Sequence, residues 1–255
     1  MYNLTAYNLF APYFILVSLL LVFPQTLIAG EIRVAVASNF TSTMKLLAAQ
    51  YKQQTGNKVI LAAGSTGKHF AQISNGAPFD AFFAADTRHP ALLETKELAI
   101  PDTRFTYAIG RLVLWSKDEN FIDNTDNILE SGNFTRLAIA NPKLAPYGMA
   151  AQQALKAKGL WTQLQDRIVR GENIAQTLQF IWSGNAQLGF VALSQIQQLH
   201  PKAKGSYWIV DPLLYDPIQQ QAILLKDKPE ARLLLKFVKS NAGRAIIKRN
   251  GYDLP

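Results

Sequence analysis

The sequence predicts an α/β protein made of two α/β domains with a ligand cleft between them. Short apolar segments typical of strands alternate with segments of helical spacing, first from Ile32 and again from Leu137. Such alternation indicates parallel sheets whose two faces are covered by helices. Between the two stretches lies a long apolar run, Phe105 to Trp115, with Gly110 near its middle. This run is placed to serve two sheets in succession and to act as a hinge.

The elements of the first half follow from their residue patterns. Residues 32–37 alternate apolar and small side chains, as a buried strand does, and residues 40–54 place apolar side chains at helical spacing. Gly56 is expected to end that helix. The other elements predicted here are a strand at 58–63, a helix around Phe70 and a strand at 79–85.

The second half repeats this pattern, and the C-terminal region adds a strand at 222–226 and a helix at 229–248. If these last elements return to the first sheet, domain I comprises 31–109 plus 218–255, and domain II comprises 110–217. Two or more chain crossings of this kind suit hinge closure around a ligand. The other elements predicted in the second half are strands at 137–140, 167–169, 188–193 and 207–210 and helices at 148–158 and 174–183.

Four strand-to-helix turns carry small or polar residues. They lie at 38–39, 64–67, 141–151 and 171–174. In the third turn, the backbone N–H groups of Tyr147, Gly148 and Met149 are expected to be unpaired, at the positive end of a helix dipole. Anions bind at such places, and ligands of open α/β sheets bind at the carboxyl ends of strands. The four turns therefore predict one anion site.

The sequence offers no catalytic constellation, so no enzyme activity and no cofactor are predicted. The three histidines, His69, His89 and His200, stand in polar settings expected to be exposed, without metal-ligand spacing. Asp80 and Asp86 are expected to cap the helix that follows them. No hydrolase, Walker or Rossmann pattern is present. The absence of cysteine excludes disulfides, thiolate metal sites and lipid attachment through cysteine.

The first thirty residues differ from the rest because they contain no charged side chain, whereas the whole chain has a net charge of +8. Residues 9–23 are almost wholly apolar, too short for a comfortable membrane span of roughly 20 residues. Residues 1–30 are therefore predicted to be a signal peptide, with an uncleaved N-terminal anchor as the alternative. The basic residues are scattered, which argues against a nucleic-acid partner and favours attraction of small anions.

Several ordered motifs resemble the periplasmic molybdate-binding proteins of ABC transporters, over residues 31 to 255. The motifs are V-A-S-N-F, G-S-T-G, N-G-A-P-F-D-A-F-F-A-A-D, R-F-T-Y-A-I-G-R-L-V-L-W-S, N-P-K-L-A-P-Y-G, R-I-V-R-G-E-N-I-A-Q and L-G-F-V-A-L. The resemblance implies a type II periplasmic-binding-protein fold that holds a tetrahedral oxyanion between its domains.

The resemblance also implies a ligand set, with molybdenum held only as bound molybdate. Some family members use a tyrosine hydroxyl in the strand that matches residues 188–193, but this chain has Ala192 there, and Asn39 looks like the substitute used by another branch. The implied ligands are the Ser38 hydroxyl, Asn39, the Thr66 hydroxyl, the backbone N–H groups of Tyr147 and Ile174, and Ser65 if the turn is shifted by one residue.

The function implied is that of an exported, periplasmic receptor that captures molybdate, and tungstate as well, and delivers it to an ABC transporter permease. The chain is expected to act as a monomer and to perform no reaction. A receptor for sulfate or another tetrahedral oxyanion is the nearest alternative. Enzymes and ligand-sensing regulators on the same fold are more remote alternatives.

Overall fold

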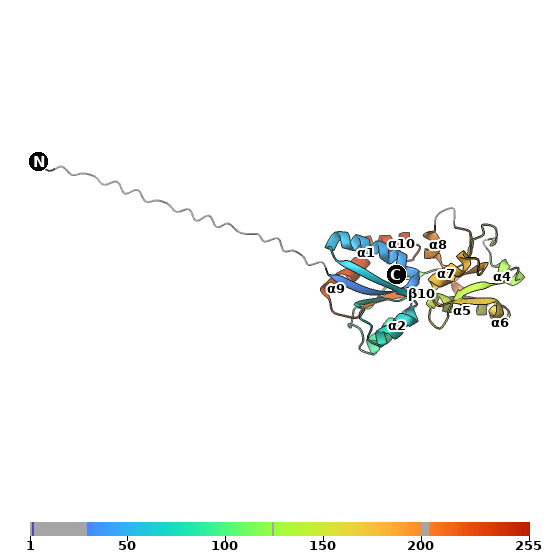
Figure 1. The fold of residues 1–255 in the computed structure, drawn as a ribbon, viewed down its shortest axis with the longest axis horizontal. Helices are drawn as coiled ribbons and strands as arrows, with labels where there is room; N and C mark the ends of the chain where they lie inside the picture. Colours follow the sequence, from blue (N-terminus) through green and yellow to red (C-terminus); the bar gives the residue numbers. More distant parts are fainter. Residues whose placement is uncertain (1, 3–29, 124, 200–203) are drawn as a thin grey trace.

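The computed structural model describes residue 2 and residues 30–123, 125–199 and 204–255. They form two lobes, each built on a five-stranded sheet, that lie beside one another along the long axis of the molecule (Figure 1). The predicted signal peptide or anchor at 1–30 lies almost entirely outside the described residues. No helix in the described part of the chain combines the length and the apolar character that crossing a membrane requires.

The first lobe contains a sheet with the strand order β2-β1-β3-β10-β4. Strand β1 runs parallel to β2 and β3, whereas β10 runs antiparallel to β3 and β4. The strands are β1 (Glu31–Ala37), β2 (Lys58–Gly64), β3 (Ala81–Phe83), β4 (Phe105–Gly110) and β10 (Ile218–Leu224), and the helices are α1 (Thr41–Thr55), α2 (Thr66–Ser74), α3 (Arg88–Thr95), α9 (Pro229–Lys239) and α10 (Asn241–Arg249), with a short 3-10 turn η1 (Ser38–Phe40) before α1.

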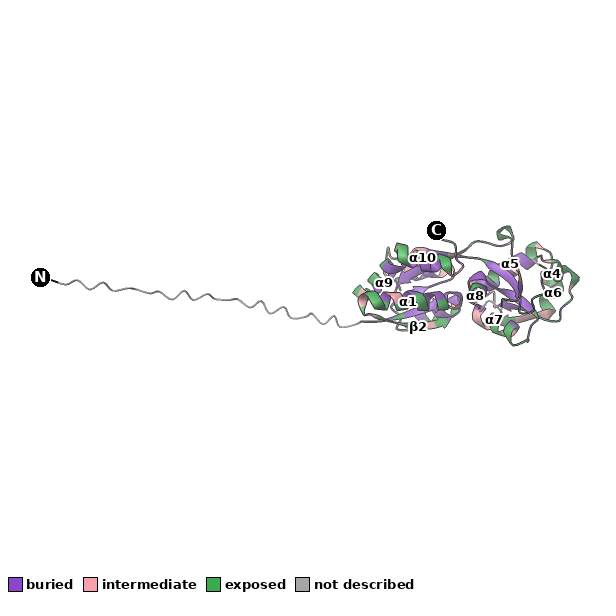
Figure 2. Ribbon diagram, turned by 90° about the horizontal axis from the view of Figure 1, so that it is seen from above, coloured by how far each residue is buried: buried purple, intermediate pink, exposed green. Residues whose placement is uncertain are grey.

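The two faces of this sheet are buried by different helices, as the period-two alternation of a strand requires. Val34 and Val36 of β1 pack into a core shared with α1, α9 and α10. Ala35, between them, joins a second core with Ile73 of α2 and Leu93 of α3. Figure 2 shows the sheets as buried and the outer helix faces as exposed.

The second lobe has the strand order β7-β6-β8-β5-β9. Strand β6 is parallel to β7 and β8, and β5 is antiparallel to β8 and β9. The strands are β5 (Leu112–Ser116), β6 (Leu137–Ala140), β7 (Ile168–Gly171), β8 (Leu188–Ala192) and β9 (Ser206–Ile209), and the helices are α4 (Asn127–Ser131), α5 (Pro146–Ala157), α6 (Trp161–Leu164), α7 (Ile174–Trp182) and α8 (Leu193–Gln197), with 3-10 turns η2 (Gln165–Arg167) and η4 (Pro212–Leu214).

The predicted hinge run forms two strands in different sheets. Strand β4 ends at Gly110 and β5 begins at Leu112, so Arg111 passes from one lobe to the other. The guanidinium of Arg111 donates to both carboxylate oxygens of Asp253, at 2.6 Å and 3.1 Å, which ties the crossing to the C-terminal segment. This hydrogen-bonded carboxylate raises the pKa of Arg111. The proposed domain boundaries stay a prediction.

Three expectations about the elements were wrong. The sheets are mixed rather than parallel, because β10 and β5 enter them antiparallel. The third strand spans only Ala81–Phe83 instead of 79–85. The predicted helix at 229–248 is two helices, because Ser240 adopts an extended conformation and its hydroxyl caps α10 by accepting the N–H of Gly243.

The expectation that Asp80 and Asp86 both cap helices is half right. Asp86 does so, since its Oδ1 accepts the backbone N–H of His89 at 3.0 Å. Asp80 is buried instead, accepting the N–H of Arg33 at 2.8 Å and pairing with the ammonium of Lys228 at 3.0 Å. It therefore links β1 to the chain that follows β10.

The expectation that His69 is exposed is also wrong. Its side chain is 3% exposed and lies beneath the first strand-to-helix turn. Nε2 lies 3.2 Å from the carbonyl oxygen of Val36, and Nδ1 lies 3.1 Å from the side-chain oxygen of Gln72. Burial lowers the pKa of His69, because the charged imidazolium loses its hydration there. His89 is half-buried against Asp86, and His200 lies outside the described residues.

The lowered pKa of His69 predicts a pH dependence of stability. The unfolded chain binds a proton at His69 near pH 6.5, whereas the folded chain resists it. The free energy of unfolding should therefore be undiminished by His69 above about pH 6.5 and should fall as the pH drops toward the lowered folded value.

Denaturant unfolding at a series of pH values tests this prediction. His69→Gln should flatten the loss of stability between about pH 7.5 and about pH 5.5, whereas His89→Gln serves as the histidine control. If the free energy of unfolding of His69→Gln depends on pH as that of the wild type does, the burial of His69 does not cause the loss of stability.

Candidate functional site

A small cavity lies where the two lobes meet, at the carboxyl ends of their central strands. Its volume is about 10 Å³, which gives room for one small ion or water. Residues from both lobes line it: Ala37, Ser38, Asn39, Gly64, Ser65, Thr66, Ala85, Ala145, Pro146, Tyr147, Asn173 and Ile174. All the residues that the sequence suggested as ligands therefore meet at one place.

The first lobe supplies hydroxyl groups from the turns after β1 and β2. Ser38 follows β1 and is half-buried, while Ser65 and Thr66 follow β2 and are 2% and 1% exposed. The Oγ of Ser65 has no hydrogen-bond partner among the described residues. The Oγ1 of Thr66 accepts the backbone N–H of Ala85 at 3.0 Å, which leaves its hydroxyl proton free to be donated.

The second lobe supplies backbone N–H groups from the starts of α5 and α7. Asn173 caps α7 by accepting the N–H groups of Ala175 and Gln176, so the N–H of Ile174 has no partner among the described residues. The N–H of Tyr147 likewise has none there. Both groups stand at the positive ends of helix dipoles.

The expectation that three N–H groups are unpaired after β6 was wrong for two of them. Gly148 and Met149 donate to the carbonyl oxygen of Ala145, at 2.9 Å and 3.1 Å. The helix begins at Pro146 rather than near Gly148, and Pro146 has no N–H to satisfy. Only the N–H of Tyr147 is therefore available to a ligand.

The side chain of Asn39 is committed to the protein. Its amide group donates to the side-chain oxygen of Gln220 at 2.8 Å and to the hydroxyl of Tyr252 at 3.1 Å. The Tyr252 hydroxyl in turn donates to the backbone carbonyl of Asn39 at 2.8 Å. Burial raises the pKa of Tyr252, so this hydroxyl stays neutral and keeps its proton. Because both amide hydrogens are used within the protein, a ligand would contact the turn at Asn39 without receiving a hydrogen bond from its side-chain amide group.

The electrostatics of the cavity suit an anion. None of the described residues that line it carries a charge, and none is a carboxylate that would accept a proton from a ligand. The starts of α2, α5 and α7 all border it, and helix starts carry positive partial charge. Hydroxyl and N–H donors without competing acceptors bind a deprotonated oxyanion. In the described residues no group of three His, Asp or Glu side chains is placed to hold a metal ion.

Direct contacts hold the lobes together around the cavity. The N–H of Gly67 on α2 donates to the carbonyl oxygen of Leu144 in the second lobe at 2.9 Å. The ammonium of Lys68 pairs with Glu172 at 2.8 Å, but both side chains are about half exposed, so this ion pair contributes at most about 1 kcal/mol. A Cβ on Gly67 would lie 3.2 Å from backbone atoms of Leu144, which explains the glycine.

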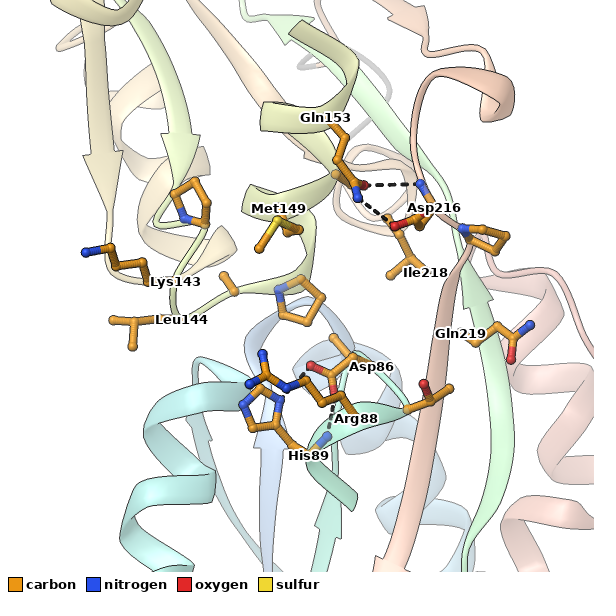
Figure 3. Close-up of a pocket in the computed structure, with 17 residues that line it drawn as sticks. Asp86, Arg88, His89, Lys143, Leu144, Met149, Gln153, Asp216, Ile218 and Gln219 are labelled. Carbon is orange, nitrogen blue, oxygen red and sulfur yellow. Dashed lines mark hydrogen bonds and ion pairs between the residues drawn. The ribbon is translucent and has the colours of Figure 1, made fainter. Parts of the chain in front are cut away.

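A wider groove of about 550 Å³ adjoins the cavity and shares Ala85, Ala145 and Pro146 with it. Figure 3 shows the polar side chains of this groove, some of which are paired with one another. Asp86 lies 2.7 Å from Nδ1 of His89, and Gln153 donates to Asp216 at 2.6 Å. The groove is the outer part of the interlobe cleft.

Sequence reasoning missed the residues behind the turns. Gln220, Tyr252 and Tyr107 form buried hydrogen bonds around Asn39. The ring of Tyr107 packs in the core of the first lobe. Strand β10 carries three consecutive glutamines, Gln219 to Gln221, and the sequence alone does not single out the buried one. Ala192 is buried in β8 and does not line the cavity.

Comparison with known proteins places this chain among solute receptors. Residues 32–253 match the family of bacterial extracellular solute-binding proteins. The chain is 46% identical to the molybdate-binding protein ModA of Azotobacter vinelandii, over 89% of this chain and 91% of that protein. It is 40% identical to the molybdate-binding protein ModA of Rhodobacter capsulatus, over 88% of each.

Solved structures agree with these relatives. The periplasmic molybdate-binding protein of Azotobacter vinelandii superposes with a TM-score of 0.84 at 43% identity, covering 88% of this chain and 99% of that one. The sulfate-binding protein SubI of Mycobacterium tuberculosis superposes with a TM-score of 0.70 at 12% identity, covering 88% and 87%, which shows a shared fold alone.

The tight approach of Gly67 to Leu144 predicts that Gly67→Ala opens the lobes. The added methyl group crowds the second lobe only when the lobes are closed, whereas alanine favours helix α2 itself by at most about 1 kcal/mol. Small-angle X-ray scattering should give a larger radius of gyration for Gly67→Ala, with an unchanged or higher melting temperature. Ser74→Ala, at the exposed end of the same helix, should leave the radius of gyration unchanged. An unaltered radius in Gly67→Ala would refute the role of this contact in closure.

Proposed function

The chain belongs to the bacterial extracellular solute-binding proteins and, within them, to the family of molybdate-binding proteins; from this premise we propose that it captures molybdate in the cavity between its lobes. Like these relatives, it is a binding protein and not an enzyme. The observation that carries the proposal is the cavity itself, which gathers unpaired neutral donors from both lobes and no charged side chain.

The proposed ligand set comes from four turns. The hydroxyls of Ser38, Ser65 and Thr66 donate from the first lobe, and the N–H groups of Tyr147 and Ile174 donate from the second. The turn at Asn39 completes the set. Ser65 stands out, because its buried hydroxyl has no partner among the described residues and a bound oxygen would supply one. No cofactor takes part in this proposal.

Neutral donors are sufficient for tight binding. A hydrogen bond to a charged group contributes roughly 1.5–3 kcal/mol, so six of them supply about 9–18 kcal/mol before the costs of association. Nanomolar affinity corresponds to about 12 kcal/mol net. The dipoles of the helices spread the countercharge over several peptide groups, so no lysine or arginine is needed in the cavity.

The same donors select against protonated anions. Phosphate keeps a proton near neutral pH, and its buried O–H needs a hydrogen-bond acceptor. No carboxylate lines the cavity to accept that proton. Leaving that proton unpaired costs about 1–3 kcal/mol. Molybdate, tungstate and sulfate carry no proton at this pH, so the size of the closed cavity separates them. Tungstate, which matches molybdate in shape and charge, is proposed to bind as well.

The proposed site of action is outside the cytoplasm. The family is extracytoplasmic, and the chain is proposed to deliver its anion as a monomer to the membrane permease of an ABC transporter. Export through residues 1–30 fits this proposal, with cleavage or retention as an anchor to be determined by the N-terminal sequence of the exported protein.

Calorimetric titration of residues 31–255, stripped of bound anion, tests the function. Molybdate should bind one-to-one with nanomolar affinity, and sulfate and phosphate should bind at least a hundredfold more weakly. A preference for sulfate would assign the chain to the alternative receptor class, and a lack of binding to any of the three would overturn the proposal.

Removing the Ser65 hydroxyl should weaken molybdate binding at least tenfold. Ser65→Ala deletes a donor to the anion but leaves no protein group unpaired, so the melting temperature without anion should be unchanged or higher. Ser74→Ala, in the exposed last turn of the same helix, is the matched control and should bind as the wild type does. Wild-type affinity in Ser65→Ala, measured by the same titration, would show that its hydroxyl does not contact the ligand.

A further inference from the structure

Gln220 is a fully buried amide in a strand that otherwise buries apolar residues. It lies in β10 with an exposed fraction of 0%, whereas its neighbour Gln219 is exposed. The pairing of β10 with β4 shifts register between Gln220 and Gln221, so the regular alternation is interrupted at this place. Buried amides are costly unless each polar atom is hydrogen-bonded. The contacts of Gln220 therefore show why this residue is tolerated in the strand.

The amide oxygen of Gln220 faces the anion-binding turn of the first lobe. It accepts the side-chain N–H of Asn39 at 2.8 Å and lies 3.1 Å from the hydroxyl of Tyr107. Burial raises the pKa of Tyr107 well above its ordinary value, so that hydroxyl remains a donor. Because the single proton of the Tyr107 hydroxyl also faces the carbonyl oxygen of Ala84, 3.0 Å away, the amide group of Asn39 is the donor that fixes which way Gln220 points.

The amide nitrogen of Gln220 consequently points toward the second lobe. It donates to the hydroxyl of Tyr147, with 3.4 Å between the two atoms. Tyr147 carries one of the unpaired N–H groups at the cavity, and its side chain reaches back to the hinge. A Cβ at Gly110 would lie 2.1 Å from the Tyr147 hydroxyl, so the end of β4 must be glycine to admit it.

We propose that Gln220 is a positioning residue that couples the anion-binding turns of the two lobes. It holds Asn39 from the first lobe and Tyr147 from the second, and it does so beside the hinge rather than in the cavity. The inference rests on the proposed function, because it assigns Gln220 a role in retaining the captured oxyanion.

The coupling acts on the closed form. The bond between Gln220 and Tyr147 joins the lobes, so it forms when they close and breaks when they open. Gln220 should therefore affect how long an anion is held and not how fast it arrives. The bonds of the Asn39 amide group lie within the first lobe, so Asn39 is already held before the lobes close and its amide group serves the protein and not the ligand.

Stopped-flow binding of molybdate to Gln220→Leu, Tyr147→Phe and the double variant tests the coupling. Each single variant should raise the dissociation rate constant about tenfold and leave the association rate constant within about twofold. The double variant should lose no more than a single one, because both changes break the same link. Gln163→Leu, at an exposed glutamine of α6 that lines neither the cavity nor the groove, is the control and should behave as the wild type. Tyr147→Phe retains the backbone N–H that faces the cavity.

A distance between the lobes gives a readout that does not need an anion. The chain has no cysteine, so Lys52→Cys on α1 and Lys156→Cys on α5 provide two labelling positions, both exposed and one in each lobe. Gln220→Leu should shift the label distance toward longer values in the protein stripped of anion, and Gln163→Leu should not.

The outcomes separate this inference from the proposed function. A wild type that fails to bind molybdate overturns the function, and the label distances then decide the coupling. A wild type that binds, together with additive losses in the double variant or unchanged dissociation in Gln220→Leu, overturns the coupling alone. A lower melting temperature in Gln220→Leu without faster dissociation or longer label distances would assign Gln220 to the core and likewise overturn it.

Discussion

The need for unpaired donors in a buried place is the constraint on which this structure depends. A buried N–H or O–H without a partner costs free energy, so a fold keeps few of them. Here hydrogen bonds within the protein satisfy the neighbouring N–H groups. Asn173 takes the N–H groups of Ala175 and Gln176, and the carbonyl of Ala145 takes those of Gly148 and Met149. The donors left over face the cavity, where an oxyanion would satisfy them. In the proposed function, the bound anion supplies the hydrogen-bond partners that these helix starts lack among the described residues.

Each lobe holds part of this donor set, so in the proposed function closure is part of binding. The hydroxyl groups come from turns of the first lobe, and the N–H groups come from helices of the second. The lobes are joined by a single crossing residue at Arg111 and by the return through η4 into β10. Affinity in such an arrangement is reduced by the fraction of molecules that are open. Contacts away from the cavity, such as Gly67 with Leu144 and Gln220 with Tyr147, therefore belong to the binding energetics.

Much of the fold was predictable because its patterns are local. The alternation of strands and helices, the hinge run around Gly110 and the four turns were all visible in short windows of sequence. The errors arose where distant residues decide. His69 is surrounded by residues of β1 and by Phe79 and Phe82, and Asp80 pairs with Lys228 from the other end of the chain. Nothing near either residue in the sequence reveals such partners.

The sequence by itself determined the order of the elements, the resemblance to molybdate receptors and the residues at each strand end. Those properties depend on periodicity and turn chemistry, which act over a few neighbouring residues. Only the tertiary structure decided which donors lack a partner among the described residues, the Ser65 hydroxyl among them, and that Asn39 is held by Gln220. Asn39 and Gln220 stand 181 positions apart in the chain, so their contact exists only after the sheet has formed. Hydrogen bonds between such distant residues are set by packing, which residue patterns do not encode.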